Sequence, residues 1–241
     1  KDYADEEVAS NYGYLSGYKK PIEITDQIDI LMAHWPNLNP DKALRYMSEV
    51  YPKLQFPNWV EGPFALIRPG FFSDKYGEEL EEVLKALEKA RDGRFVNYCE
   101  RKLGPEHLIQ TEESLAAMAR IIERQPDSDI IIVPEQFGIR HRGRSVRRAG
   151  VYIKNTPLEF GEGSKNVGTM ILTHPNRLAH FDDLWIDCPG DRYRPGAVGD
   201  FCNAPCFGFH GGKAKFDTRR VDSFSEGYGS VSGALPECLE T

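Results

Sequence analysis

The sequence predicts an α+β fold in which a helical half comes first and a β-rich half, with an antiparallel or mixed sheet, follows it. Up to residue 125, apolar residues recur at three- and four-residue spacing, which is typical of amphipathic helices. From residue 126 they fall into short β-rich runs separated by Gly- and Pro-rich turns. We expect one integrated domain made of a tyrosine-rich arm (1–20), a helical region (21–125) and a β-rich region (126–241).

Four helices are expected in the first half. Thr25 is a candidate N-cap for the first, and Asn39 followed by Pro40 begins the second. The third covers residues 76–92, where leucines and a valine line one face and charged residues line the other. The fourth opens at Thr111 and has an apolar face of its own.

Irregular segments and strands complete the prediction. Residues 52–70 contain four prolines and are expected to form an irregular connection. The glycine-rich segment 161–168 matches neither a P-loop nor a dinucleotide fingerprint, and we interpret it as a flexible hairpin tip. If that tip folds near the arginines described below, Lys165 would add to an anion site. The expected strands are 129–133, 151–154, 169–173, 184–188, 206–210 and 213–217.

Composition limits the class of protein. A chain of 241 residues that is 40% hydrophobic can bury a core, and no run approaches the roughly 20 apolar residues that span a bilayer. The first residues are acidic, unlike a signal peptide, and Lys1 in place of Met indicates processing or trimming. Five scattered cysteines do not resemble a disulfide framework, so we expect a cytoplasmic protein. The net charge of −7 disfavours a surface that coats nucleic acid throughout, though not a focused site.

The main functional signal is a cluster of five arginines and one histidine within residues 140–148, directly after an apolar run. In a strand over 139–145, alternate arginines would share one face. In a short helical turn capped by Ser145 and ending at Gly150, the last three arginines would gather instead. Guanidinium groups are suited to phosphate or carboxylate. The expected anion-binding residues are Gln136, Arg140, His141, Arg142, Arg144, Arg147 and Arg148.

Three functions are compatible with this cluster. The favoured hypothesis is binding of the phosphate groups of RNA or DNA, with Gln136 and His141 as hydrogen-bonding neighbours of the arginines. The second is an enzyme acting on a phosphorylated small molecule, in which the arginines clamp the phosphate and His174 or Asp187 moves a proton. The third is a structural or protein-interaction role, with the arginines in internal salt bridges. The sequence identifies no cofactor.

Other candidate sites have weaker patterns. Four residues are possible zinc ligands: Cys188, Cys202, Cys206 and His210. They lack a Cys-x2-Cys knuckle, and a role as buried free thiols explains the three cysteines more simply. Cys188 and Arg194 match the Cys-x5-Arg spacing of a phosphate-binding loop, but no helical pattern follows the arginine, so a turn is favoured. A His/carboxylate constellation fits no standard ligand spacing: His174, His180, Asp182, Asp183 and Asp187.

Three segments of the chain resemble a family of uncharacterised bacterial proteins with no assigned activity. They are residues 133–149 (VPEQFGIRHRGRSVRRA), 172–178 (LTHPNRL) and 183–191 (DLWIDCPGD). The resemblance extends over most of the chain, including the segment 229–236. It implies no fold, cofactor or reaction, so the three hypotheses stand on the residues alone.

Overall fold

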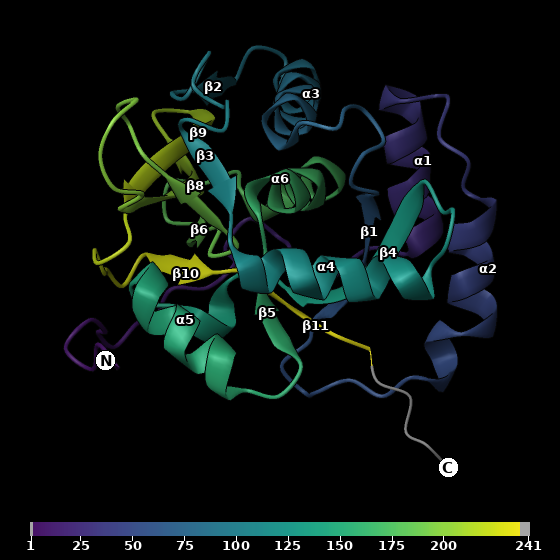
Figure 1. Ribbon diagram of the computed structural model, residues 1–241, viewed down its shortest axis with the longest axis horizontal. Coiled ribbons are helices and arrows are strands. Elements are labelled where there is room, and N and C mark those ends of the chain that lie inside the picture. Colours follow the sequence, from purple (N-terminus) through teal and green to yellow (C-terminus); the bar gives the residue numbers. More distant parts are fainter. Residues whose placement is uncertain (1, 237–241) are drawn as a thin grey trace.

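The computed structural model describes residues 2–236 and has an α+β fold (Figure 1). Its helices occur in both halves of the chain. They are α1 (Ile24–His34), α2 (Asp41–Glu49), α3 (Tyr76–Ala90), α4 (Glu112–Arg124), α5 (Val146–Asn155) and α6 (Ser164–Thr173), with the 3-10 turns η1 (Tyr51–Lys53), η2 (Ile139–His141) and η3 (Pro175–Arg177).

The strands form two sheets. They are β1 (Gly62–Ile67), β2 (Phe95–Asn97), β3 (Leu108–Gln110), β4 (Ile130–Gln136), β5 (Glu159–Gly161), β6 (Trp185–Asp187), β7 (Asp191–Tyr193), β8 (Asn203–His210), β9 (Lys213–Arg220), β10 (Tyr228–Ser230) and β11 (Ser232–Ala234). The first sheet is antiparallel, in the order β1-β4-β11-β5. The second has the order β10-β6-β8-β7-β3, and β9 joins it by pairing with β8 and β2. It is mixed, because β10 runs parallel to β6 and β2 parallel to β9.

Helix α6 lies at the centre of the molecule, where it contacts α3, β1 and β8 (Figure 1). Gly168 permits the close approach of α3, because a Cβ at this position would lie 2.9 Å from Cγ1 of Val83. At the N-terminal end of α6, the Asp191 carboxylate accepts hydrogen bonds from the backbone N–H and the hydroxyl of Ser164. A negative charge at this end complements the helix dipole. The core is therefore built around one buried helix.

Helices and strands interleave instead of forming two halves. Strand β1 lies inside the segment 52–70 that was expected to be irregular, and Pro63 fits there because β1 is an edge strand. Residues 151–154 and 169–173, expected to be strands, are helical in α5 and α6. The segment 161–168 is not a hairpin tip, because α6 begins within it. All ten residues of α6 are buried, so this helix has no polar face and no periodic pattern to detect.

The remaining elements follow the sequence closely. The four helices expected in the first half are present as α1 to α4. The hydroxyl of Thr111 caps α4 by accepting a hydrogen bond from the N–H of Ser114, whereas α1 starts at Ile24 without a side-chain cap, so Thr25 is not its N-cap. Four of the six expected strands are present, as β4, β6, β8 and β9. Within residues 2–236, no helix combines the length and the apolar character needed to cross a membrane.

Candidate anion-binding site

The arginine cluster begins where the chain leaves β4 and turns sharply. Gly138, with φ at 112°, directs the backbone into η2, so the strand considered for residues 139–145 does not form. Gln136 holds this turn, because its side-chain oxygen accepts hydrogen bonds from the N–H groups of Gly138 and Arg140. Its amide nitrogen donates to the carbonyl oxygen of Ser230 at 2.8 Å. Gln136 therefore organises the backbone of the site from a buried position.

Ser145 begins α5, as the helical alternative predicts. Its hydroxyl accepts a hydrogen bond from the N–H of Arg148 at 3.0 Å. The helix does not stop at Gly150 but continues to Asn155. The last three arginines of the cluster gather at the start of this helix. Positive charge is unfavourable at a helix N-terminus, so these arginines need negative partners close by.

Two glutamates of the N-terminal arm (residues 2–20) supply those partners. Glu6 pairs with Arg147, and Glu7 lies 2.9 Å from both Arg144 and Arg148. A β-bridge between Glu7 and Arg144 holds the arm in place. Hydrogen bonds from Arg147 lower the pKa of Glu6, and hydrogen bonds from Arg148 and Arg144 lower the pKa of Glu7. The two carboxylates of the arm thus form ion pairs with three of the five arginines.

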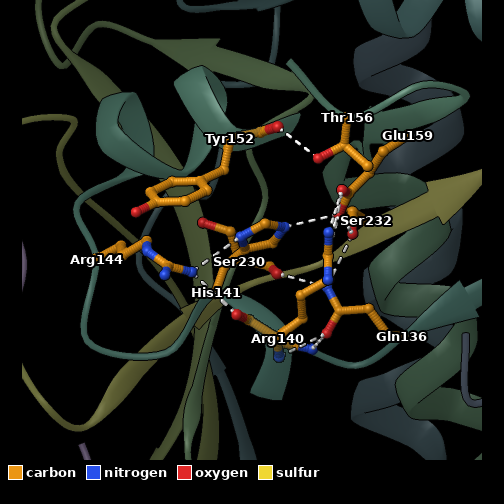
Figure 2. Close-up of polar contacts among 10 residues, drawn as sticks. Gln136, Arg140, His141, Arg144, Tyr152, Thr156, Glu159, Ser230 and Ser232 are labelled. Atoms are coloured by element: carbon orange, nitrogen blue, oxygen red, sulfur yellow. Dashed lines mark hydrogen bonds and ion pairs between the residues drawn. The ribbon is translucent and has the colours of Figure 1, made fainter. Parts of the chain in front are cut away.

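Glu159, the first residue of β5, neutralises Arg140 (Figure 2). Its Oε1 lies 2.9 Å from Nε of Arg140 and its Oε2 lies 3.1 Å from Nη2, which is a bidentate pair. The same carboxylate accepts hydrogen bonds from Nε2 of His141 at 2.7 Å and from the hydroxyl of Ser232 at 2.6 Å. The Glu159 side chain is fully buried. Its carboxylate joins η2, β5 and β11 through these hydrogen bonds.

The protonation states in this network follow from burial and hydrogen bonding. Burial opposes ionisation of Glu159, but hydrogen bonds from His141 and Arg140 hold its pKa at about 2. Burial lowers the pKa of His141, so its ring is neutral at pH 7 and donates from Nε2. Its Nδ1 then accepts from Nη1 of Arg144 at 3.5 Å. This network assigns the tautomer and makes His141 a neutral link between Glu159 and Arg144.

Binding of nucleic acid by the arginine cluster would require guanidinium groups that the chain itself leaves without an ion pair, and most of them are paired. Four of its five guanidinium groups form ion pairs inside the molecule. Arg142 is the exception, since within residues 2–236 it donates only to the carbonyl oxygen of Tyr12, at 2.7 Å. The ring of Tyr152 lies 3.9 Å from the guanidinium carbon of Arg144 and 4.7 Å from that of Arg148. The internal salt bridges are those that the structural hypothesis predicts.

A cleft lies beside the cluster, between α5, β5 and the start of α4, and we call it the α5 cleft. Its volume is about 400 Å³, within the usual range of small-molecule sites. Glu113 and the paired Glu159 contribute negative charge to its walls. Its apolar walls come from Val151, Ile153, Phe160 and Pro189, and its cations are Arg147, Lys154 and Arg192.

Arg192 is the half-buried cation of the α5 cleft. Its Nη1 donates to the carbonyl oxygens of Pro189 at 2.9 Å and Asp191 at 2.7 Å, and no carboxylate of residues 2–236 forms an ion pair with it. Burial lowers the pKa of Arg192, while Asp191 and Glu113 oppose that shift. Lys154, at the rim, also lacks a side-chain partner in the described part of the chain. The cleft therefore contains two cations that the molecule leaves without an ion pair.

His174, a candidate for proton transfer, lies in the aromatic core and does not line the α5 cleft. Its ring packs edge-on against Tyr18 and Phe64. Nδ1 donates to the carbonyl oxygen of Met170, and Nε2 accepts from the N–H of Ile22. Burial lowers its pKa to about 4, so the ring stays neutral. Both nitrogens hold elements of the core together.

Asp187, the second candidate, is fully buried at the end of β6. Its nearest cation is Arg219, at 3.5 Å. Burial raises the pKa of Asp187 to about 7, and Arg219 opposes that rise. Asp187 does not line the α5 cleft either, so the structure does not bring the two proton-transfer candidates to the arginines. Asp183, from the same constellation, instead accepts hydrogen bonds from the N–H groups of Ala179 and His180 in a turn.

The cysteine motifs do not assemble. Burial raises the pKa of the Cys188 thiol and so favours its neutral form, and Arg194 donates to backbone carbonyls elsewhere. Cys206 is buried inside β8, and His210 is exposed at the end of that strand. Cys202 is partly exposed. Among residues 2–236, no group of three or more His, Cys, Asp or Glu side chains is arranged to hold a metal ion.

Lys165 does not join the arginines. Its ammonium group is buried and pairs with Glu79 of α3 at 3.1 Å. It also donates to the carbonyl oxygen of Arg68 at 3.2 Å. This ion pair ties the start of α6 to α3 and engages the ammonium group, so Lys165 adds nothing to the cluster.

A buried carboxyl pair, Glu135 and Glu162, was not recognised from the sequence. Glu135 lies in β4 and Glu162 follows β5, on either side of β11. Burial and the neighbouring Glu162 raise the pKa of Glu135 well above its usual range, and burial raises that of Glu162 to about 7. Glu135 therefore keeps its proton in the folded protein, which avoids two adjacent buried negative charges. The available signal was a glutamate that follows the apolar run Ile130–Val133 closely.

Comparison of the chain with protein-family models, curated proteins and solved structures returned no match.

Proposed function

We propose that this protein binds a small molecule carrying a phosphate or carboxylate group in the α5 cleft. The observation that carries the proposal is Arg192, a half-buried guanidinium group whose described partners are two backbone carbonyls. Burying a charge is costly unless an opposite charge lies close to it. An anionic ligand would supply that charge, and Lys154 would add a second contact at the rim.

The shape of the cleft supports a ligand with an apolar body. Phe160 and Pro189 form one wall, and Val151 of α5 faces the same space. The space beside Gly150 is open, because a Cβ at this position would have no neighbour within 4 Å. The volume of about 400 Å³ suits a small molecule better than a duplex.

The arginine cluster has a supporting role in this proposal. Glu159 lines the cleft and, through Arg140 and His141, fixes η2 against β5. Arg147 lines the cleft from the other side while paired with Glu6 of the arm. These ion pairs hold the walls in place, and a preorganised site binds with a smaller entropic cost.

Calorimetry with phenyl phosphate, benzoate and uncharged phenol tests the charge requirement. We expect the two anions to bind and phenol not to bind. Arg192→Ala should weaken the affinity at least tenfold and Lys154→Ala by a smaller factor, because Arg192 is the more buried cation. Lys19→Ala, at an exposed lysine outside the cleft, is the matched control. Absence of binding to the wild-type protein, or equal affinity in Arg192→Ala, contradicts the proposal.

A second variant separates loss of binding from loss of folding. Gly150→Leu keeps both cations and fills the cleft, and leucine is favoured over glycine inside a helix. We expect it to melt at or above the wild-type temperature and to bind neither anion. Binding at wild-type affinity by this variant would place the ligand elsewhere.

Nucleic-acid binding is the second candidate, and one observation favours it. The two carboxylates that pair with Arg144, Arg147 and Arg148 belong to the arm. A polyanion that displaced the arm would therefore gain three arginines at once. The double variant Glu6→Gln/Glu7→Gln should then bind a single-stranded RNA oligonucleotide more tightly than the wild type, with an affinity that falls steeply with salt. No binding by either protein in a filter assay rejects this candidate.

A further inference from the structure

A second cationic cavity lies at the C-terminal end of α3, away from the arginine cluster. We call it the α3–η3 hollow, because it is formed by the end of α3, by η3 and by the turn between β8 and β9. Its volume is about 340 Å³. Its side-chain lining contains two arginines and no acidic residue: Ala90, Arg91, Arg94, Pro175, Asn176, Ala179 and Phe209, together with Gly212.

Arg91 is the inner cation of the hollow. Its Nη1 donates to the carbonyl oxygen of Leu178 at 2.8 Å, and its Nη2 donates to that of Pro175 at 3.0 Å. These carbonyls satisfy two N–H groups but do not cancel the charge. Burial lowers the pKa of Arg91, as does the neighbouring Arg94, while Asp183 opposes that shift.

Arg94 is the outer cation. Among residues 2–236 its side chain has no hydrogen bond, ion pair or ring contact. Asp183, whose charge raises the pKa of Arg91, forms no ion pair with either arginine, and its carboxylate already accepts hydrogen bonds from Leu15 and Ser16. Two guanidinium groups that face one cavity repel each other unless a negative charge lies between them.

The end of α3 does not supply that negative charge. A helix C-terminus carries a partial charge of roughly −0.5, which is smaller than the two full positive charges of Arg91 and Arg94. The contrast with the arginine cluster is direct. There, four guanidinium groups face carboxylates of the same chain, whereas here an acidic protein leaves two arginines in a cavity without one.

We propose that the α3–η3 hollow binds a phosphate group between Arg91 and Arg94. The planar forks of two guanidinium groups match the oxygens of a phosphate dianion. The amide of Asn176 can donate a further hydrogen bond, and the ring of Phe209 gives an apolar side to the cavity. This site is separate from the α5 cleft and does not depend on a ligand binding there.

Titration of the full chain with inorganic phosphate, followed by amide NMR, tests the proposal. We expect the resonances of Asn176 and Gly212 to shift on titration. Arg94→Glu should weaken this response at least tenfold and leave phosphate effects on Gly150, in the α5 cleft, unchanged. Arg45→Glu, at an exposed arginine of α2, is the matched control for a reversed charge. Arg192→Ala should affect only Gly150, so failure at one site is distinguishable from failure at the other.

Two results would overturn the inference. One is the absence of any phosphate-dependent shift of Asn176 and Gly212 in the wild-type protein. The other is an unchanged response in Arg94→Glu, whose fold should be intact because the side chain has no contact to lose among the described residues. Titration with acetate decides the ligand class, because a monoanion that binds as tightly as phosphate would contradict the assignment to a phosphate dianion.

Discussion

The arginine cluster and the Glu135–Glu162 pair neutralise their charges in opposite ways. In the cluster, four guanidinium groups face carboxylates of Glu6, Glu7 and Glu159. In the core, Glu135 and Glu162 face each other, and a proton takes the place of a cation. Arginine cannot lose its proton near neutral pH and so requires an anion, whereas a buried carboxyl group can become neutral by protonation. We therefore expect salt to act on the first region and pH on the second.

The largest expected effect on stability is at Glu159, the buried carboxylate of the arginine cluster. Glu159→Gln keeps the shape of the side chain but removes the charge that pairs with Arg140 and accepts from His141. Removing one partner of a buried ion pair typically lowers the free energy of unfolding by about 3–5 kcal/mol. Urea unfolding at pH 7 measures this loss. The matched control is Glu78→Gln, which removes the exposed Lys75–Glu78 pair, and a loss no greater than that of the control would contradict the role of Glu159 as a buried hub.

The next effect sharpens the contrast between the two regions through pH. In the folded protein Glu162 titrates at about 7, above its ordinary value of 4.5, so the native state binds more protons than the unfolded state in this window. The free energy of unfolding should therefore fall as the pH rises from 4.5 to about 7, by at most roughly 1.4 kcal/mol per pH unit for one group. Chemical unfolding at a series of pH values measures the slope.

Glu135→Gln tests whether the proton between the two carboxyl groups is the cause. The amide of glutamine donates a hydrogen bond to Glu162 without needing to take up a proton. We expect this variant to be more stable than the wild type at pH 8, by about 1–3 kcal/mol, and similar to it at pH 5. Destabilisation at both pH values would show that the pair does not share a proton.

The smallest effect is expected at the partly exposed end of the cluster. Glu6→Gln/Glu7→Gln removes the ion pairs that hold the arm, which salt already weakens. We expect faster proteolysis within residues 2–20 and a loss of stability that shrinks in high salt. Because the pKa values of Glu6 and Glu7 are lowered in the folded state, their contribution should also disappear as the pH falls below 4.5. Equal proteolysis rates for variant and wild type would show that these ion pairs do not hold the arm.

Prediction from the sequence succeeded for some local signals. Thr111 caps α4 as expected, and Ser145 caps α5 as in one of the two alternatives, because a cap depends on residues within the first turn. The cap predicted at Thr25 does not form. It failed for α6, whose burial on all sides removes the amphipathic pattern. It also missed β1, because four prolines in the segment 52–70 conceal an edge strand.

The sequence by itself determined where the charges of this protein lie along the chain and indicated the caps of two helices, α4 and α5. Only the tertiary structure decided which charges are neutralised. Arg144 and Arg148 form ion pairs with Glu7, although more than a hundred residues separate them along the chain. Arg91 and Arg94 form no ion pair with a carboxylate of the described chain. The physical reason is that the energy of a charge depends on its distance to other charges and on burial, and neither quantity follows from separation along the sequence.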